Sequence, residues 1–487
     1  MIEITAKVHD KFSIEFKVGF IVRRKLKLND FAINTWIFIP NSLDINPLTY
    51  SKNQFYRDVK SNIRLITPVF LLREISIGSA IPLQNLEKIF HTVASNPTRT
   101  NIREYEYQIR MFTAIFKSAI RNEVIHLLNN TIEEDMEYLV SSYLESIKDI
   151  TTKYRDLRRI INVPTISPEI LDYYFFGDEF ISDSAEQSSC RIIRFLEIRN
   201  KKKYGKSIGM LADFWRKEIV YKREKGYIVV DRNSPTRNRE FVFRRGVLKK
   251  YVESDLFLQA RKKKDGVLVE QIYYSIAAGL SMIFATAVAF SVQMKYGNFT
   301  MPLFVALVVS YMLKDRIKEL MRFYFAHQLG TRYFDHKTII CIKDTPIGWS
   351  KEAMDFITDD RVPREVMDIR SRSPLLEAEN RTMDEKILLY RKLVHIDREE
   401  IGKNRDYPIA GINDIMRLHL TRFMQKMDNP GESLYLLDEN DSASVIQGEK
   451  VYYLNIVMKF QFDDQVDYKR FRVVLTQSGI TELEELK

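Results

Sequence analysis

Residue types that could perform catalysis occur in this chain without the spacing that catalysis needs. Gly205-Lys206-Ser207 matches the last three residues of a phosphate-binding loop, but Asn200 stands where that loop requires an earlier glycine. The residues before it are predicted to form a helix rather than a strand, so nothing would cradle a phosphate. Nucleotide binding is therefore not expected here.

Histidines and carboxylates give two candidate metal sites. Glu123 and His126 have the i, i+3 spacing of one half of a di-iron site, but the sequence holds no second such pair. His327, Asp335 and His336 could hold a metal if a turn brought them together. Neither set is specific, so no cofactor or metal is expected. Whether the chain is an enzyme stays open.

Two charge-free apolar segments, 272–292 and 299–313, dominate the middle of the chain. A hydrocarbon core of about 30 Å needs about 20 apolar residues in a helix, so the first segment is long enough to span it. The second reaches only about 22 Å and needs snorkelling by Lys295 and Lys314, together with local thinning of the bilayer. The sequence therefore predicts a two-helix transmembrane hairpin.

Small residues support this interpretation against the alternative of a buried hairpin in a soluble core. A soluble helix of this length normally keeps one polar face, whereas 272–292 shows only scattered Ser, Thr and Tyr. Small side chains recur every four residues, the stripe that lets membrane helices approach closely. The predicted transmembrane packing residues are Ala277, Ser281, Ala285 and Ala289 in the first segment and Ala306 and Ser310 in the second.

Basic residues flank the hairpin on both sides, against a single Lys295 in its connecting loop. By the positive-inside rule both flanks, and therefore both termini, are expected to be cytoplasmic. The chain shows no secretory signal, and its two cysteines suit a reducing compartment. An inner (plasma) membrane location follows. The residues expected to contact anionic lipid headgroups are Arg261, Lys262, Lys263, Lys264, Lys314 and Arg316.

The segment 201–264 is strongly basic, with 20 Lys and Arg against 7 Asp and Glu. Three interpretations compete. The favoured one is a face held against anionic lipid, where each basic residue contributes about 1 kcal/mol. A less favoured one is nucleic-acid binding through phosphate contacts. The third is an ordinary solvated surface around two short strands, 227–230 and 240–244.

The N-terminal region is predicted to begin with an antiparallel β-hairpin, because apolar residues alternate over 12–22 and again over 31–39. Helices are expected over 102–128 and 136–161. The second carries a four-three apolar seam, which favours antiparallel pairing of these two helices or, alternatively, self-association between protomers. The seam residues are Met136, Val140, Tyr143, Ile147, Ile150, Tyr154, Leu157 and Ile161.

Beyond the membrane, a helix from 299 to 329 is expected to continue as a cytosolic stalk, beside an amphipathic segment at 247–263. The C-terminal region is predicted to contain helices at 383–394 and 412–427. Alternating residues over 452–462 and 471–475 then predict an antiparallel meander with one buried face.

The fold class expected is an α+β membrane protein. A transmembrane hairpin divides an N-terminal β-hairpin plus helical cytosolic region from a C-terminal α+β cytosolic domain. The expected domains are a β-rich subdomain (1–80), a helical subdomain (81–225), a basic hairpin with an amphipathic helix (226–265), the transmembrane hairpin (266–313), a stalk helix (314–330) and the C-terminal domain (331–487).

The sequence does not disclose an activity, so function rests on architecture. The expected role is a membrane-tethered scaffold or sensor, self-associating as a homo-oligomer, most simply a dimer. The alternatives are a membrane-anchored enzyme with its site in the C-terminal domain and a basic nucleic-acid-binding membrane protein. A pore would require a multimer, lined by Tyr273, Ser281, Thr286 and Ser310.

Overall fold

The computed structural model shows a mixed α+β chain, 52% helical and 29% strand. It describes all residues except 1, 24, 79, 165, 298–299, 333, 372–374, 376–384, 404–405, 429, 438–442 and 487, and it describes no side chain for 268 and 325–332. The chain forms two compact units. Unit 1 comprises Met1–Ile63, Gln259–Ile401 and Asn413–Lys487, and unit 2 comprises Arg64–Leu258 and Gly402–Ile412.

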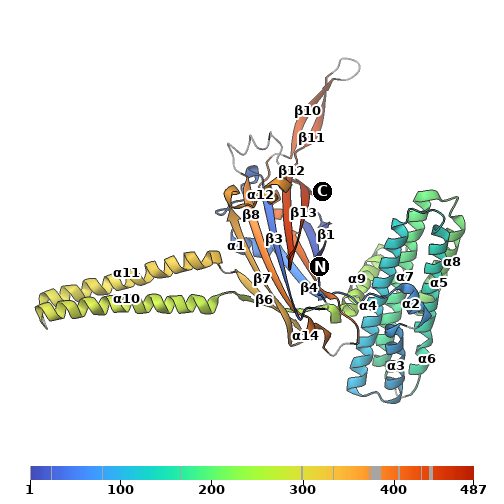
Figure 1. Cartoon of the computed structure of the whole chain (residues 1–487). Helices are drawn as coiled ribbons and strands as arrows, with labels where there is room; N and C mark the ends of the chain where they lie inside the picture. The colour runs from blue at the N-terminus through green and yellow to red at the C-terminus, as the bar shows by residue number, and fades with distance from the viewer. Residues whose placement is uncertain are drawn as a thin grey trace. The chain divides into compact units, whose positions relative to one another are not determined.

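Unit 1 is built on a large antiparallel sheet that collects strands from both ends of the chain (Figure 1). N-terminal β3 pairs with β8 on one side and with β12 on the other. The two regions that the sequence indicated as separate domains therefore share one sheet. In spatial order its strands are β14 (Gly479–Leu486), β13 (Gln465–Thr476), β12 (Tyr452–Phe462), β3 (Leu28–Ile39), β8 (Lys386–Asp397), β7 (Thr345–Ile357), β6 (His336–Ile342) and β5 (Gln259–Lys264).

A smaller sheet packs on one face of the large one. Aromatic rings join the two sheets: Phe16 lies 5.6 Å from Phe471, and Phe20 lies 5.2 Å from Phe31, measured between ring centroids. The opposite face of the large sheet is covered by α12 (Arg364–Arg370), which packs near Trp36. The strands of the smaller sheet are β1 (Ile2–Asp10), β2 (Ser13–Ile21), β9 (Gly411–His419) and β4 (Val59–Leu65).

Further short elements complete unit 1. β10 and β11 are hydrogen-bonded to each other as an exposed, separate two-stranded antiparallel ribbon. The remaining bounds are η1 (Asn41–Leu43), α1 (Lys52–Asp58), η3 (Asp359–Arg361), α14 (Arg398–Gly402), α15 (Thr421–Met424), β10 (Gly431–Leu437) and β11 (Ala443–Glu449).

The predicted N-terminal β-hairpin is wrong, although both of its strands exist. The strand predicted at 12–22 is β2, which pairs with β1, whereas that at 31–39 is β3 in the other sheet. Their apolar faces meet across the space between the sheets, as the Phe20–Phe31 contact shows. Face-to-face packing therefore replaced the edge-to-edge pairing expected from proximity in sequence.

The helices predicted at 383–394 and 412–427 are also wrong; part of the first lies outside the described residues. These segments form β8 and β9, the latter followed by the single turn α15. Leu388, Tyr390 and Val394 are buried on β8. They lie at even-numbered positions, so they share one face of a strand, in which side chains alternate with a period of two. The meander predicted from 452 onward is confirmed as β12 and β13.

Unit 2 is helical. The seam predicted at 136–161 is buried within the unit, so self-association through it is wrong. α5 contacts α2 and α7, and α4 lies chiefly along α3 and α7 rather than along α5. The helices are α2 (Leu72–Ile77), α3 (Ile81–Ser95), α4 (Arg99–Asn129), α5 (Met136–Asp156), α6 (Arg158–Ile161), α7 (Pro168–Asn200), α8 (Gly205–Glu224), α9 (Pro235–Val252) and η2 (Ser254–Leu256).

The short strand predicted at 240–244 and the amphipathic stalk at 247–263 are wrong. Ser234 accepts a hydrogen bond from the Arg237 backbone N–H, and Pro235 occupies the first turn, so a helix, α9, begins here. Residues 227–230 form no regular strand. The segment 259–264 is β5, which pairs with β6 instead of lying along the stalk helix.

A glycine allows α5 and α7 to approach closely. A Cβ at Gly177 would overlap the Tyr154 hydroxyl, which donates a hydrogen bond to the Tyr174 carbonyl at 3.0 Å. We expect Gly177→Ala to lower the free energy of unfolding by about 1–3 kcal/mol through overpacking. Thermal unfolding of the full chain in mild detergent measures this.

The matched control is Gly209→Ala in α8, where no atom lies within 4 Å of the added methyl group. Alanine is the better helix former, so this variant should be unchanged or more stable by up to about 1 kcal/mol. Equal unfolding temperatures for the two variants would contradict the close packing of α5 on α7.

Candidate functional site

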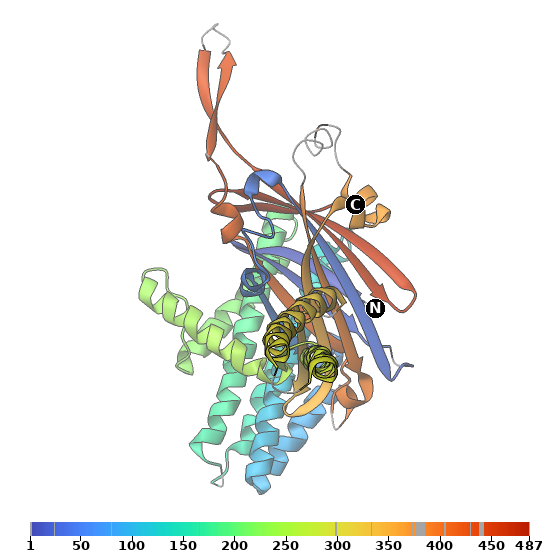
Figure 2. The ribbon, with the colours of Figure 1, turned by 90° about the vertical axis from the view of Figure 1, so that its left-hand side faces the viewer.

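The most distinctive feature of unit 1 is a helical hairpin inserted between the edge strand of the large sheet, β5, and its paired neighbour, β6. β5 leads into α10 (Val267–Tyr296), α11 (Met301–Arg332) follows, and the chain returns in β6. Gly266 has a φ of 70° at the start of α10, a left-handed conformation that glycine adopts without strain. Figures 1 and 2 show the two helices side by side. The predicted continuation of the second helix beyond 313 is confirmed.

Small side chains lie where α10 packs against α11. Ala277, Ser281 and Ser310 are buried, with Ser281 only 1% exposed. The Ser310 hydroxyl donates a hydrogen bond to the Ala285 carbonyl across the pair at 3.2 Å. Ala289 and Ala306 are half-buried, like Ala285. Of the predicted packing residues, Ser310 and Ala285 therefore contact each other within the hairpin, and Ala277 and Ser281 are buried.

The outward surface of the hairpin is apolar around its circumference. Ile283 is 66% exposed and Met294 89% exposed, although both are long hydrophobic side chains. The Ser275, Ser281 and Thr286 hydroxyls donate to backbone carbonyls of their own helix. Further exposed side chains are Ile272, Ile276, Leu280, Met282, Phe290, Met301, Phe304, Val305, Leu307, Val308, Val309, Tyr311, Met312 and Leu313.

Of the two predicted spans, one meets the requirements for crossing a membrane within the described part of the chain. Val269–Tyr296 has a mean hydropathy of 1.9 over its best window and sufficient length. By composition α11 does not, because it carries six charged residues between Lys314 and Arg322. The prediction of two spanning helices is therefore not confirmed, and α10 alone is weak evidence for a membrane.

Lysine–tyrosine contacts mark both ends of the uncharged part of the hairpin. Lys295 lies over the Tyr296 ring at 5.4 Å near the turn, and Lys314 lies over the Tyr311 ring at 4.1 Å on α11. Arg316 pairs with Glu319 at 3.4 Å. Lys and Tyr are residues that anchor helices at a membrane–water boundary.

The basic residues 261–264, expected to contact lipid, lie on the edge strand β5 and are exposed. Arg261 pairs with Asp344 at 2.9 Å, and Lys264 pairs with Glu270 at 2.8 Å. Lys262 approaches Glu352 at 3.4 Å. Nearby carboxylates thus offset part of their charge, a feature that the local count of lysines and arginines could not show.

A polar cluster lies where the hairpin joins the sheet. The Asp335 carboxylate accepts hydrogen bonds from Lys52 Nζ, the Tyr56 hydroxyl and the Met354 backbone N–H, each at 2.9 Å. Asp265, on the other side of the hairpin, pairs with Lys351 at 2.9 Å. Both ends of the hairpin are therefore tied to the sheet by ion pairs.

A second ionic cluster lies in the interior between the sheets. Lys392 pairs with Glu352 at 3.0 Å and with Asp414, and Asp414 accepts a hydrogen bond from Ser61 at 2.5 Å. Burial raises the pKa of Glu352, but Lys392 and Lys262 outweigh burial and lower that pKa to about 2. Burial lowers the pKa of Lys392, whereas Asp414 and Glu352 raise it well above its usual value. The cluster is charged and mutually paired.

These clusters do not form a recognisable catalytic site. Among the described residues no group of His, Cys, Asp and Glu could hold a metal ion. The Asp335 carboxylate already accepts hydrogen bonds from Lys52 and Tyr56. The side chain of His327 is not among those that the structure describes. His126 is exposed on α4.

The phosphate-loop candidate is also accounted for by secondary structure. Gly205 begins α8, with Ser207 buried in its first turn. The residues before it belong to α7 and a short turn, not to a strand, which agrees with the sequence interpretation.

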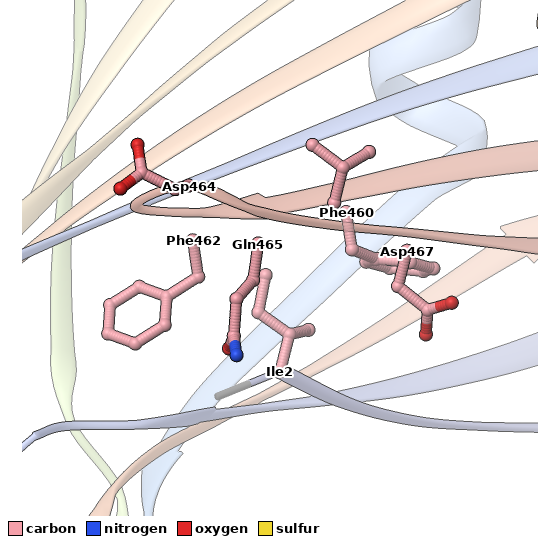
Figure 3. Close-up of a pocket in the computed structure, with 7 residues that line it drawn as sticks. Ile2, Phe460, Phe462, Asp464, Gln465 and Asp467 are labelled. Carbon is pink, nitrogen blue, oxygen red and sulfur yellow. The ribbon is translucent and has the colours of Figure 1, made fainter.

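A surface hollow of about 520 Å³ lies beside the β12–β13 turn. Its apolar part is formed by Ile2, Phe460, Phe462 and Val466, and its acids are Asp464 and Asp467. Figure 3 shows the Asp464 carboxylate on the opposite side of the turn from the Phe462 ring and well apart from Asp467. The two carboxylates do not converge, so the hollow lacks paired acid–base groups.

Unit 2 contains a buried network on α7 that sequence reasoning missed. Asp178 accepts hydrogen bonds from Arg155 at 3.1 Å and from the Tyr221 and Tyr227 hydroxyls at 2.8 Å. Arg155 also forms a two-pronged contact with Glu218, at 3.0 and 2.8 Å. These contacts join α5, α7 and α8, and every acid in them has a partner.

A separate buried cluster between α7 and α8 places a lysine of the basic segment in the interior. Lys222 is buried and pairs with Glu186 at 2.7 Å and with Asp183. Burial and the neighbouring Glu186 raise the pKa of Asp183 to about 6, although Lys222 acts in the opposite direction. The segment 201–264 is therefore not a continuous solvated or lipid-facing surface.

No known protein family, curated protein or solved structure matches this chain.

Glu352 should contribute to acid sensitivity. Its pKa in the folded chain lies below the usual 4.5, so its stabilisation is present above about pH 4.5 and is lost as the pH falls toward 2. We expect Glu352→Gln to destabilise the protein by about 3 kcal/mol at neutral pH and to flatten the loss of stability below pH 4.5. Urea unfolding at pH 7 and pH 3 in mild detergent measures both effects.

Glu485→Gln provides the control, because Glu485 forms an exposed ion pair with Lys469. Surface pairs contribute at most about 1 kcal/mol. If Glu352→Gln and Glu485→Gln behaved alike at both pH values, the buried cluster would not have the strength described.

Proposed function

We propose that this chain is an integral membrane protein that inserts the α10–α11 hairpin into a lipid bilayer. The observation that carries the proposal is the exposed apolar surface of the hairpin, from Met282 on α10 to Leu313 on α11. Within the described residues, α10 and α11 pack chiefly against each other. Water is a poor solvent for such a surface, and a bilayer is a good one.

The size of the effect supports lipid contact. Complete burial of a large apolar side chain contributes about 1.5–3 kcal/mol, so half-exposed side chains gain about 1 kcal/mol each from a bilayer. Summed over the exposed side chains of the hairpin, the gain is on the order of 15 kcal/mol. The backbone adds little cost because helices satisfy their own hydrogen bonds.

The connection to β5 and β6 supports a topology with both termini on one side. These strands pair directly, so the two bases of the hairpin emerge together. The basic residues at the base outnumber the single Lys295 near the turn, which favours a cytoplasmic location for both termini at the inner (plasma) membrane. Anionic lipid headgroups are the partners that Lys314 and Arg316 favour.

Within that membrane, the favoured role is a tethered scaffold or sensor that self-associates. The ionic contacts of Asp335 and Asp265 join the hairpin base to the sheet, as a sensor requires. Leu320 and Phe323 remain exposed on the charged part of α11 and are candidates for contact with a second copy. A membrane-anchored enzyme and a nucleic-acid-binding protein remain the alternatives.

Charge placed on the hairpin tests the proposal. Phe290→Lys together with Val308→Lys puts two lysines on exposed positions near the middle of the uncharged part, and a lysine at mid-bilayer costs about 2.5–3.5 kcal/mol. We expect carbonate-resistant insertion into anionic vesicles, after cell-free synthesis, to fall by more than tenfold.

A control variant separates this effect from a general loss of apolar surface. Ile198→Lys changes an exposed isoleucine of α7 in unit 2 and should insert like the wild type. Wild-type protein that carbonate removes completely from the vesicles would refute the membrane assignment.

A further inference from the structure

Contacts between α10 and α11 fix which residues lie at the same level along the hairpin. The Ser310 hydroxyl meets the Ala285 carbonyl, and the Arg322 guanidinium lies over the Tyr274 ring at 5.2 Å. The two residue numbers in each pair have almost the same sum. This is expected for antiparallel helices, because one step forward on one helix is level with one step backward on the other. Lys314 on α11 therefore lies level with about Ser281 on α10.

This register limits the uncharged length that the two helices share. From the level of Ser281 to Lys295 there are fourteen residues, as the sequence numbering gives. At 1.5 Å per residue they cover about 21 Å. A typical hydrocarbon core is about 30 Å thick, so the shared uncharged part is about 9 Å too short.

Side-chain direction does not make up the difference. In a helix the Cα–Cβ bond tilts toward the N-terminus. The N-terminus of α11 is at the turn, so Lys314 starts toward the turn, and its ammonium group indeed lies over Tyr311. Lys295, near the end of α10, starts toward the base of the hairpin. The ammonium group of Lys314 is thus directed into the uncharged part, whereas that of Lys295 stays beside Tyr296 at the turn.

Deeper insertion would be unfavourable. It would cover Ile272, Ile276 and Leu280 of α10 at the expense of immersing the charged residues of α11 at the same level. Each immersed charge costs more than a half-exposed apolar side chain gains. The charged residues are Lys314, Asp315, Arg316, Lys318, Glu319 and Arg322.

Shallower insertion is also unfavourable. If the hairpin entered one leaflet only, Lys295 would lie near the middle of the bilayer, where a lysine is most costly. The turn is better placed in the far headgroup region, where Tyr296 is also favoured. The hairpin therefore has to cross completely while being short.

Resting on the membrane insertion proposed above, we propose that the hairpin selects or locally produces a bilayer thinner than average. A span shorter than the hydrocarbon core is accommodated by thinning, and thinning costs free energy for each ångström of mismatch. The preferred partner is accordingly a membrane with short acyl chains, in addition to anionic headgroups.

The test measures insertion across vesicles of increasing thickness. The full chain is synthesised without cells in the presence of dilauroyl, dimyristoyl, dioleoyl or dierucoyl phosphatidylcholine vesicles with a constant fraction of the matching phosphatidylglycerol. Carbonate-resistant protein is then quantified. We expect at least tenfold more insertion into dilauroyl than into dierucoyl vesicles.

Two variants, compared with each other, control for the fact that thin bilayers accept inserted proteins more easily in general. Lys314→Leu, Asp315→Leu and Arg316→Leu together move the first charge of α11 to Lys318, lengthening the uncharged part by about 6 Å. Lys318→Leu with Glu319→Leu also removes charges but leaves the boundary at Lys314. The ratio of the first variant to the second should rise several-fold from dilauroyl to dioleoyl vesicles.

The outcomes are distinct. A wild-type preference for thin vesicles, with the ratio rising, supports the proposal. Equal insertion at every thickness, or a ratio that stays constant, overturns the thickness preference and leaves membrane insertion standing. Absence of insertion into every vesicle overturns both.

Discussion

The exposed apolar surface of the α10–α11 hairpin is the constraint on which the rest of this account depends. Two paired helices can satisfy every backbone hydrogen bond by themselves, but they cannot bury side chains on all sides of each helix. Among the hairpin side chains that the structure describes, those buried lie on the small-residue face, with Ser281 and Ser310. Side chains such as Ile283 and Phe304 still require an apolar environment. A bilayer is the environment that such a uniform surface fits best.

The architecture of unit 1 suits an anchor of this kind. The hairpin replaces the short turn that would ordinarily connect β5 and β6, so both of its ends are held by a paired strand. Asp335 and Asp265 add ionic contacts on either side. Lys262 of β5 then contacts Glu352, which belongs to the Glu352–Lys392–Asp414 cluster that reaches β9. Displacement of the hairpin base would disturb a connected set of buried charges, which is the property a sensor needs.

Much of the helical structure could be predicted from sequence because its signals are local. Apolar spacing locates α4, α5 and the two helices of the hairpin. The small residues that pack α10 on α11 were found for the same reason. The pairing of β3 with β8 and β12 could not be found, because strands distant in sequence choose partners by tertiary packing.

The buried charges were missed for a related reason. Lys392 interrupts the apolar face of β8, but its segment also fits a helix with Lys392 in solvent. Its carboxylate partners, Glu352 and Asp414, lie on other strands and give no local signal. In unit 2, a basic composition concealed that Lys222 is buried against Glu186. A count of charges cannot distinguish a paired interior lysine from an exposed one.

The central claim, that lipid covers the uncharged part of the hairpin, is tested most directly by measuring depth along α11. Single cysteines would be introduced at Phe304, Val308, Met312, Arg316 and Leu320 in a chain whose Cys190 and Cys341 are replaced by serine, and each would carry a polarity-sensitive fluorophore. In vesicles, lipids brominated on their acyl chains should quench the labels from Phe304 to Met312, whereas aqueous iodide should quench those at Arg316 and Leu320. Iodide quenching of all five labels, with none by brominated lipid, would contradict the account.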